Sequence, residues 1–218
     1  MKKVIPVFLL VALSLSVLTP LPVQAAMFPD VPDGFWAQFY IEALAQNGII
    51  SGKPDGKFYP NEPVTRGQFA LMLYRIIEKS PDEPPEGTKT FPDVDPNTQL
   101  GKAVSAIVEL GVARGYPDGT FRPNQPITRG QMAVMITRFL GGEETAIQYK
   151  NAELPFKDKF VESQRGYIKY VYEYNIMGGT SKTTFSAGKP ATRAQTAVIL
   201  YQTQTYYWQN NLPRWGVI

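Results

Sequence analysis

The 218-residue chain contains neither cysteine nor histidine. Without cysteine there is no disulfide framework, no thiolate ligand for a metal and no thiol nucleophile. Without histidine there is no Ser-His-Asp or Cys-His catalytic arrangement, and zinc lacks its usual nitrogen ligand. Of the common hydrolytic strategies, only paired carboxylates or a hard metal held by Asp and Glu remain. We predict no cofactor.

A strong charge of either sign is also missing. The chain has 22 Lys and Arg against 19 Asp and Glu. Residues 1–25 hold two lysines and no acid, so the rest of the chain has 20 basic and 19 acidic residues, a net charge of +1. This near-neutrality argues against nucleic-acid binding through a basic stripe. The 44% apolar and 12% aromatic content predicts a folded chain.

Long apolar runs are absent except at the start of the chain. Lys2 and Lys3 precede an apolar stretch from Val4 to Val17, and Val23-Gln24-Ala25 has the small residues that signal peptidase reads. The stretch is shorter than the roughly 20 residues that span a bilayer. We therefore predict that residues 1–25 are an export signal rather than a retained anchor. The mature chain is then secreted, with no transmembrane segment.

Three blocks of sequence recur 63 residues later: FPDV at 28 and 91, GKPDGKF at 52 and GYPDGTF at 115, PVTRGQ at 63 and PITRGQ at 126. A more divergent third copy has FKD at 156, Gly179, Phe185 and PATRAQ at 190, offset by 64 or 65. We predict repeats at 26–78, 91–140 and 156–202 and a C-terminal aromatic tail at 203–218. The linkers 79–90 and 141–155 lack the apolar periodicity of a packed element.

Each repeat reads as helix, loop, helix. Trp36 to Asn47 has an apolar stripe, and Gly48 follows it where a left-handed cap is favoured. A Pro-Asp-Gly turn then returns Phe58 to the core. The second helix starts at a capping box, which is formed by Thr and Gln at 65 and 68, 128 and 131, and 192 and 195. One copy of about 50 residues buries too little surface to be stable alone. We therefore predict a mainly α fold, with three tandem helix-loop-helix repeats packed as one pseudo-threefold domain.

The repeated motifs Phe-x-Asp-Val, Gly-x-x-Asp-Gly-x-Phe and Pro-x-Thr-Arg-x-x-x-Ala resemble the S-layer homology family. The resemblance covers Phe28 to about Gln202, and three copies is that family's usual number. It implies a three-pronged spindle whose grooves bind secondary cell-wall polymers, often carrying pyruvate ketals, without covalent attachment. It also implies groove arginines and partner acids, which fall here on Arg66, Arg129 and Arg193 and on Asp30, Asp93 and Asp158.

The chain departs from the family pattern in three ways. Gln68, Gln131 and Gln195 stand where the family commonly has Glu. Repeat 2 has Gln99 and Leu100 where repeat 1 has an aromatic region around Trp36, and repeat 3 lacks the Pro-Asp-Gly turn. We therefore expect the three grooves to bind unequally.

The predicted position of each arginine favours an anion site. The first helical position lies beside unpaired backbone N–H groups and the positive end of the helix dipole. A guanidinium also matches a carboxylate in a two-pronged fashion that lysine cannot reproduce. The alternative is an exposed arginine paired with a neighbouring aspartate, which contributes little to stability.

Three aromatic residues are candidates for stacking on sugar C–H faces: Trp36, Tyr59 and Tyr116. Packing within the protein is the alternative. The alternative is favoured for Trp36, whereas the ring of Tyr116 is expected at the surface because a turn follows it. Asp55 and Asp118 are read as turn formers, since their loops lack the alternating acids of a calcium loop. We predict no metal site.

These observations predict a non-enzymatic protein of the cell surface that binds an acidic cell-wall polysaccharide. Its partner is a secondary wall polymer or a glycan linked to peptidoglycan. Two alternatives stay open. One is structural self-assembly into a surface layer, with the chain itself or other surface-layer proteins as partners. The other is a carboxylate-pair glycosidase built on acids such as Asp30, Asp33 and Asp93.

Overall fold

The structure is a computed structural model that describes residues 26–79, 86–210 and 212. The predicted export signal and Trp215 of the predicted tail lie outside these residues. No helix of the described part is long and apolar enough to cross a membrane. The helices are α1 (Gln38–Gln46), α2 (Arg66–Glu78), α3 (Gln99–Glu109), α4 (Arg129–Phe139), α5 (Glu143–Gln148), α6 (Arg165–Glu173) and α7 (Arg193–Gln209), with short 3₁₀ turns η1 (Tyr149–Asn151) and η2 (Glu162–Gln164).

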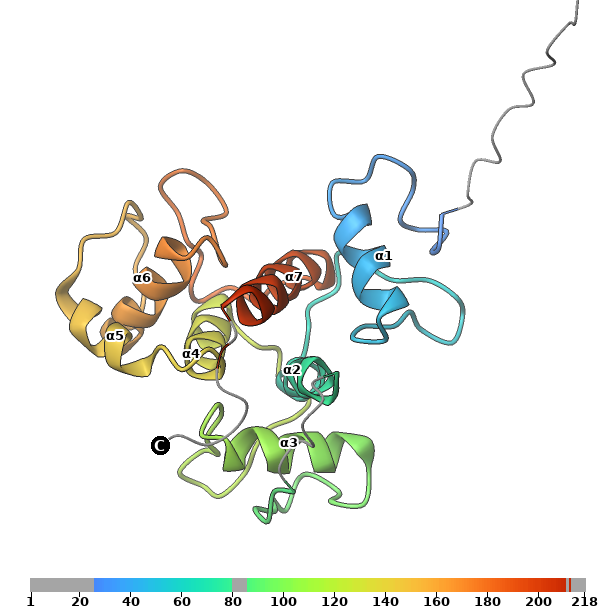
Figure 1. The fold of residues 1–218 in the computed structure, drawn as a ribbon, viewed down its shortest axis with the longest axis horizontal. Coiled ribbons are helices and arrows are strands. Elements are labelled where there is room, and N and C mark those ends of the chain that lie inside the picture. The colour runs from blue at the N-terminus through green and yellow to red at the C-terminus, as the bar shows by residue number, and fades with distance from the viewer. Residues whose placement is uncertain (1–25, 80–85, 211, 213–218) are drawn as a thin grey trace, which may run out of the picture.

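The second helices of the three repeats, α2, α4 and α7, lie at the centre, and the first helices form three lobes around them (Figure 1). Each first helix packs on a second helix from a different repeat: α3 on α2, α6 on α4, and α1 on α7. The sequence repeat is therefore not the packing unit. Each lobe joins the first helix and loop of one repeat to the second helix of the repeat before it, and the third repeat closes onto the first.

A ring of three backbone hydrogen bonds links the repeats just before the central helices. Val64 N donates to Ala191 O at 3.1 Å, Ile127 N to Val64 O at 3.0 Å, and Ala191 N to Ile127 O at 3.3 Å. The side chains of all three residues are fully buried. The ring lies where a threefold axis would pass, so the predicted pseudo-threefold arrangement is confirmed.

Local sequence signals define the helix ends. All three predicted capping boxes form, at Thr65 with Gln68, Thr128 with Gln131 and Thr192 with Gln195. Gly48 and Gly111 have φ of 70° and 68° after α1 and α3, as predicted, and Asn175 takes the same left-handed conformation in repeat 3. The first helix starts at Gln38, two residues later than expected, so Trp36 precedes it.

Two predictions about the segments outside the repeats were wrong. The linker 141–155 was expected to be irregular, but it forms α5, which packs against α6. Ala146 is the one buried residue of α5, so the sequence has no apolar stripe that would predict this helix. The tail was expected to start at residue 203, but α7 continues to Gln209, and buried Tyr207 packs on Phe139 with ring centroids 5.4 Å apart.

Candidate functional site

The three predicted groove arginines are buried where one repeat meets the next. Arg66, Arg129 and Arg193 are the first residues of α2, α4 and α7, and only 7%, 5% and 7% of their surface is exposed. Each reaches into the loop of the following repeat, and Arg193 of repeat 3 reaches back into repeat 1. We name these contacts the α2 seam, the α4 seam and the α7 seam.

Each guanidinium makes the same three contacts. Nε donates to the carbonyl of a buried phenylalanine, and the guanidinium lies over that ring. The Nε bonds are Arg66 to Phe121 at 3.1 Å, Arg129 to Phe185 at 2.9 Å and Arg193 to Phe58 at 2.6 Å. Nη2 donates to a second loop carbonyl, that of Arg114, Gly178 or Ser51, at 2.6–2.7 Å. These charge-assisted bonds and cation–π contacts hold neighbouring repeats together.

The exposed, aspartate-paired arginine that the sequence left open is therefore not found. Among the described residues, none of the three arginines forms a salt bridge. Burial lowers the pKa of all three, that of Arg129 to about 10, while nearby Asp158 opposes this change. A guanidinium stays protonated in proteins, so each seam contains a buried positive charge solvated by carbonyl oxygens.

The predicted partner acids bond to backbone rather than to arginine. The two carboxylate oxygens of Asp30 accept from the N–H groups of Phe58 and Tyr59 at 2.8 and 2.7 Å. Asp93 accepts from residues 121 and 122 and Asp158 from residues 185 and 186 in the same way. Burial would raise the pKa of Asp30, but the two N–H donors outweigh it and the pKa lies below its usual 3.8. Each aspartate thus stabilises the end of the loop whose carbonyl groups accept hydrogen bonds from the arginine.

The helix starts do not offer free N–H groups, which corrects the expectation from the sequence. The first N–H of α2, from Arg66, donates to Gln125 O at 2.8 Å, and the second, from Gly67, donates to Pro123 O at 2.9 Å. Thr65 accepts the third. The starts of α4 and α7 are satisfied in the same way by the neighbouring repeat. An anion at a seam must therefore be held by side chains.

The Nη1 group of each buried guanidinium is not bonded to a loop carbonyl. Among the described residues, Nη1 of Arg129 and of Arg193 has no hydrogen-bond partner, and neither atom is fully enclosed. Nη1 of Arg66 has only a weak contact with Met135 Sδ at 4.0 Å. The α4 and α7 seams thus each present the unused Nη1 amino group of a permanent cation.

Sequence reasoning named Tyr59 as an aromatic candidate but missed that one residue at each seam has an unusual backbone conformation. Tyr59, Arg122 and Ser186 follow the buried phenylalanines and have φ of 60°, 59° and 61°. Non-glycine residues rarely adopt this left-handed conformation, and here the paired aspartate oxygens stabilise it. No residue-type signal marks the position; only the constant spacing from phenylalanine could have identified it.

The aromatic candidates lie in different surroundings. Trp36 was expected in the core but is 60% exposed, and neighbouring Phe39 is 63% exposed. Phe39 contacts the ring of Tyr201 on α7, with centroids 5.4 Å apart, and Gln99 and Lys102 take these two positions in repeat 2. Tyr116 is half-buried at the α2 seam, 5.3 Å from the Arg66 guanidinium, and its hydroxyl accepts from Gln131.

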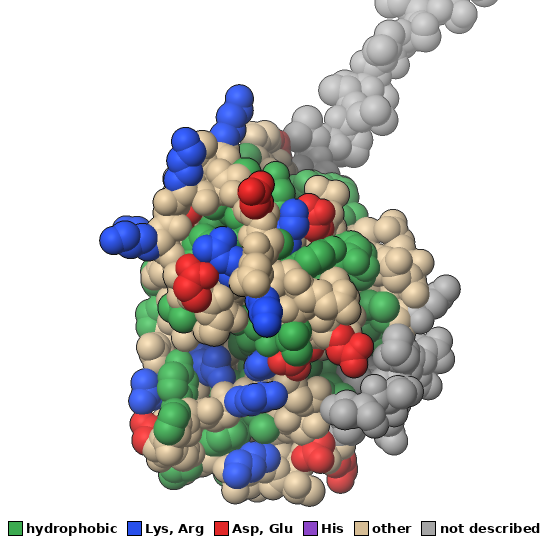
Figure 2. Space-filling view, turned by 90° about the vertical axis from the view of Figure 1, so that its left-hand side faces the viewer, with side chains coloured by type: hydrophobic (Ala, Val, Ile, Leu, Met, Phe, Trp, Pro, Cys, Tyr) green, Lys and Arg blue, Asp and Glu red, His purple; other side chains and the backbone are tan. Residues whose placement is uncertain are grey.

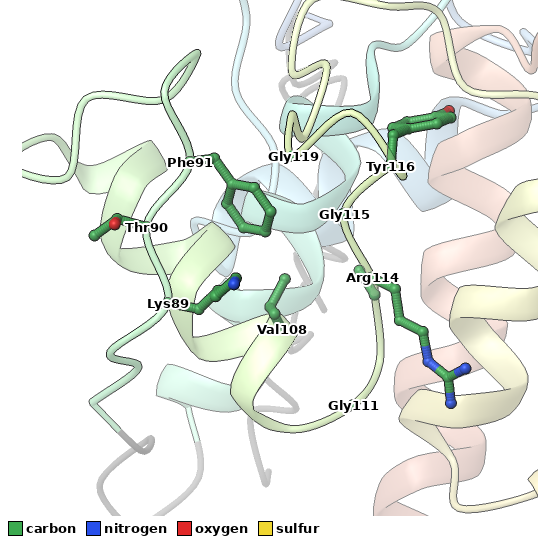
Figure 3. A pocket seen from close by; sticks show the side chains of 10 residues that line it. Lys89, Thr90, Phe91, Val108, Gly111, Arg114, Gly115, Tyr116 and Gly119 are labelled. Carbon is green, nitrogen blue, oxygen red and sulfur yellow. The ribbon is translucent and has the colours of Figure 1, made fainter.

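The same loop of repeat 2 has a pocket on its other side. Figure 3 shows this pocket, about 380 Å³ in volume, between residues 89–91 and 111–119. Phe91 and Lys89 line it, and the side chain of Arg114 points away from Phe91. Gly115 packs so closely on Phe91 that a Cβ would lie 2.4 Å from the ring. The pocket does not contain the predicted arginines or acids.

Comparison with known proteins follows the repeats. The profile of the S-layer homology domain matches residues 28–70, 90–133 and 155–197. A cellulosome-anchoring protein of Acetivibrio thermocellus is 34% identical over 121 residues, which are 52% of this chain and 26% of that protein. S-layer protein EA1 of Bacillus anthracis is 33% identical over 135 residues, 62% of this chain and 15% of that protein.

An endoglucanase of Bacillus sp. strain KSM-635 is 27% identical over 218 residues, which are 95% of this chain and 22% of the enzyme. The chain thus spans about a quarter or less of the length of these relatives. The similarity lies in the repeats whose capping boxes, loops and buried arginines are described above. The chain belongs to the S-layer homology domain family, with three tandem copies of the domain.

Proposed function

We propose that the three seams bind an acidic secondary cell-wall polysaccharide without covalent attachment, and that this binding anchors the protein at the bacterial surface. The observation that carries the proposal is the buried guanidinium in each seam, whose Nη1 group has, among the described residues, no hydrogen-bond partner in Arg129 and Arg193 and only a weak contact with Met135 in Arg66. A guanidinium donor selects carboxylate or phosphate oxygens, and three copies on one rigid scaffold allow a repeating polymer to bind at several places.

The family and the relatives support the location. Secretion and residence at the cell surface follow from the family, which includes S-layer and cellulosome-anchoring proteins. On the face in Figure 2, Lys and Arg are scattered among acidic and apolar side chains rather than joined in a stripe. Attraction through a few defined contacts fits this surface better than a broad positive field does.

A sedimentation assay with purified wall sacculi tests the proposal. The chain without residues 1–25 is mixed with sacculi before and after hydrofluoric acid removes the secondary polymer. We expect binding to the intact sacculi, weakening as salt rises, and little binding to the stripped ones. Equal sedimentation with both would contradict the proposal and point to peptidoglycan itself. The supernatant of sacculi-free samples controls for self-association.

The relatives also include an enzyme, so a hydrolytic role needs its own test. The positions of the recurring acids favour binding, because Asp30, Asp93 and Asp158 lie one in each repeat and each oxygen accepts from backbone N–H. A glycosidase instead needs two carboxyl groups flanking one bond. We expect no release of reducing sugar from wall polysaccharide during prolonged incubation. Release that disappears in the Asp30→Ala and Asp93→Ala variants would establish the enzyme.

A further inference from the structure

The three seams share a scaffold but differ at two positions that border the buried arginine. The first follows the loop glycine and holds Lys53, Tyr116 or Thr180. The second is the left-handed residue after phenylalanine and holds Tyr59, Arg122 or Ser186. Both positions are at least partly exposed in every repeat. The backbone contacts are the same in all three copies. Any difference in what the seams bind is therefore expected to come from the side chains at these two positions.

At the α2 seam these positions bring a second guanidinium beside the buried one. The Arg122 guanidinium lies 3.9 Å from the centroid of the Tyr116 ring, and that of Arg66 lies 5.3 Å from the same centroid. Nη2 of exposed Arg122 donates to Asp118 at 2.8 Å. Among the described residues, its Nε and Nη1 have no hydrogen-bond partner. Arg122 is thus held in place with most of its N–H donors unused.

At the α7 seam the aromatic and the cation exchange places, and one more acid is present than at the α2 seam. Lys53 Nζ lies 4.4 Å from the centroid of the Tyr59 ring and forms a salt bridge with Glu62. The Tyr59 hydroxyl donates to the Asp55 carboxylate. Counting Arg193 and the loop aspartate Asp30, this seam has two cations and three anions. The α2 seam has two cations, Arg66 and Arg122, and two anions, Asp93 and Asp118, because Gln125 takes the position of Glu62.

The α4 seam has neither a ring nor a charge at these two positions. Thr180 Oγ1 and Ser186 Oγ bond to each other at 2.8 Å. Lys189 takes the position of Glu62 and adds positive charge. A lysine, however, is a flexible point charge, whereas an arginine stacked on a ring presents a fixed planar fork. Of the three seams, the α2 seam alone offers two guanidinium groups.

We propose that the α2 seam is the principal site for the carboxylate of the acidic sugar, with Arg122 as the contact that determines specificity and Tyr116 as the residue that positions it. The inference rests on the proposed function and narrows it to one seam. The free N–H donors of Arg122 bind the carboxylate beside the buried positive charge of Arg66. The α4 and α7 seams make weaker, less charge-dependent contacts with the same polymer.

Titration calorimetry with purified secondary wall polymer, and with the same polymer after chemical reduction of its carboxyl groups, tests this assignment. We expect Arg122→Ser to weaken binding to the acidic polymer at least tenfold and to leave the weak binding to the reduced polymer unchanged. Serine already occupies the equivalent left-handed position at Ser186, so the backbone tolerates it. The matched control is Arg114→Ser, which removes the same charge from an exposed position in the same loop; we expect less than a twofold effect.

A transfer experiment tests sufficiency. Thr180→Tyr with Ser186→Arg, placed in the Arg122→Ser background, should recover several-fold of the lost affinity by building the pair at the α4 seam. Failure to recover, or equal losses in Arg122→Ser and Arg114→Ser, would overturn the assignment. If the unsubstituted chain binds the polymer and Arg122→Ser binds equally well, the inference fails while the proposed function stands. If the unsubstituted chain does not bind, the proposed function itself fails.

Discussion

The buried arginines bind neighbouring repeats together, and this role limits how they can be tested. Replacing Arg129 by alanine leaves the carbonyls of Phe185 and Gly178 without their charged donor. We expect the free energy of unfolding to fall by about 2–4 kcal/mol, because hydrogen bonds to charged groups contribute roughly 1.5–3 kcal/mol each and do not simply add. Urea titration measures the change.

The control for this prediction is Arg165→Ala. Arg165 forms a salt bridge with Glu162, whose side chain is 75% exposed. We expect a loss below about 1 kcal/mol, since exposed pairs contribute little. Equal losses in the two variants would show that the Arg129 contacts add no stability. Loss of wall binding after arginine replacement must therefore be read together with the unfolding data.

The loop aspartates predict a response to acid. Because the pKa of folded Asp30 is below 3.8, its stabilising contribution is complete above that pH and is lost as pH falls through the folded value. Asp30→Asn keeps one acceptor for two N–H donors and should cost about 1–3 kcal/mol at pH 7. Below pH 4 the difference between Asp30→Asn and the unsubstituted chain should shrink. A constant difference down to pH 2 would refute this. Asp33→Asn is the exposed control.

At the scale of elements, what was predicted correctly depends on neighbours in sequence. The capping boxes and the left-handed glycines after α1 and α3 depend on residues no more than four positions apart. They could therefore be predicted from the sequence. The burial of Arg66 could not be predicted, because arginine is rarely buried and the carbonyls that accept from it lie 48 and 55 residues away in sequence. The packing of α1 on α7 could not be predicted for the same reason, because the two helices are far apart in the sequence. Helix α5 could not be predicted either, because it buries one residue, Ala146, and so has no apolar periodicity in its sequence.

Close packing of the loop glycine Gly115 on Phe91 gives a prediction at the scale of elements. A Cβ at Gly115 would lie 2.4 Å from Cε1 of Phe91, which is only 6% exposed and packs on Phe121. Gly115→Ala must displace this ring, and we expect a loss of about 1–3 kcal/mol. Gly188→Ala is the control, because nothing lies within 4 Å of its added Cβ. Equal melting temperatures would contradict the packing argument.

The whole molecule closes into a ring because the third repeat binds the first. Arg193 reaches Ser51 and Phe58 across 142 and 135 residues of sequence, the same contacts that Arg66 and Arg129 make with their next repeats. No repeat has a complete lobe of its own, since each first helix packs on another repeat's second helix. Stability is thus expected to be a property of the closed ring rather than a sum over independent repeats.

Hydrogen exchange can test this closure. The amides of Val64, Ile127 and Ala191 donate around the threefold ring, and their side chains are fully buried. If the ring opens only when the whole domain unfolds, the three amides should exchange at one common rate set by global stability. Arg129→Ala, which weakens the α4 seam alone, should then speed all three equally. Faster exchange confined to the Ala191 amide, which donates to Ile127 O across the α4 seam, would mean that the repeats open separately, and wall binding would then need to be analysed seam by seam.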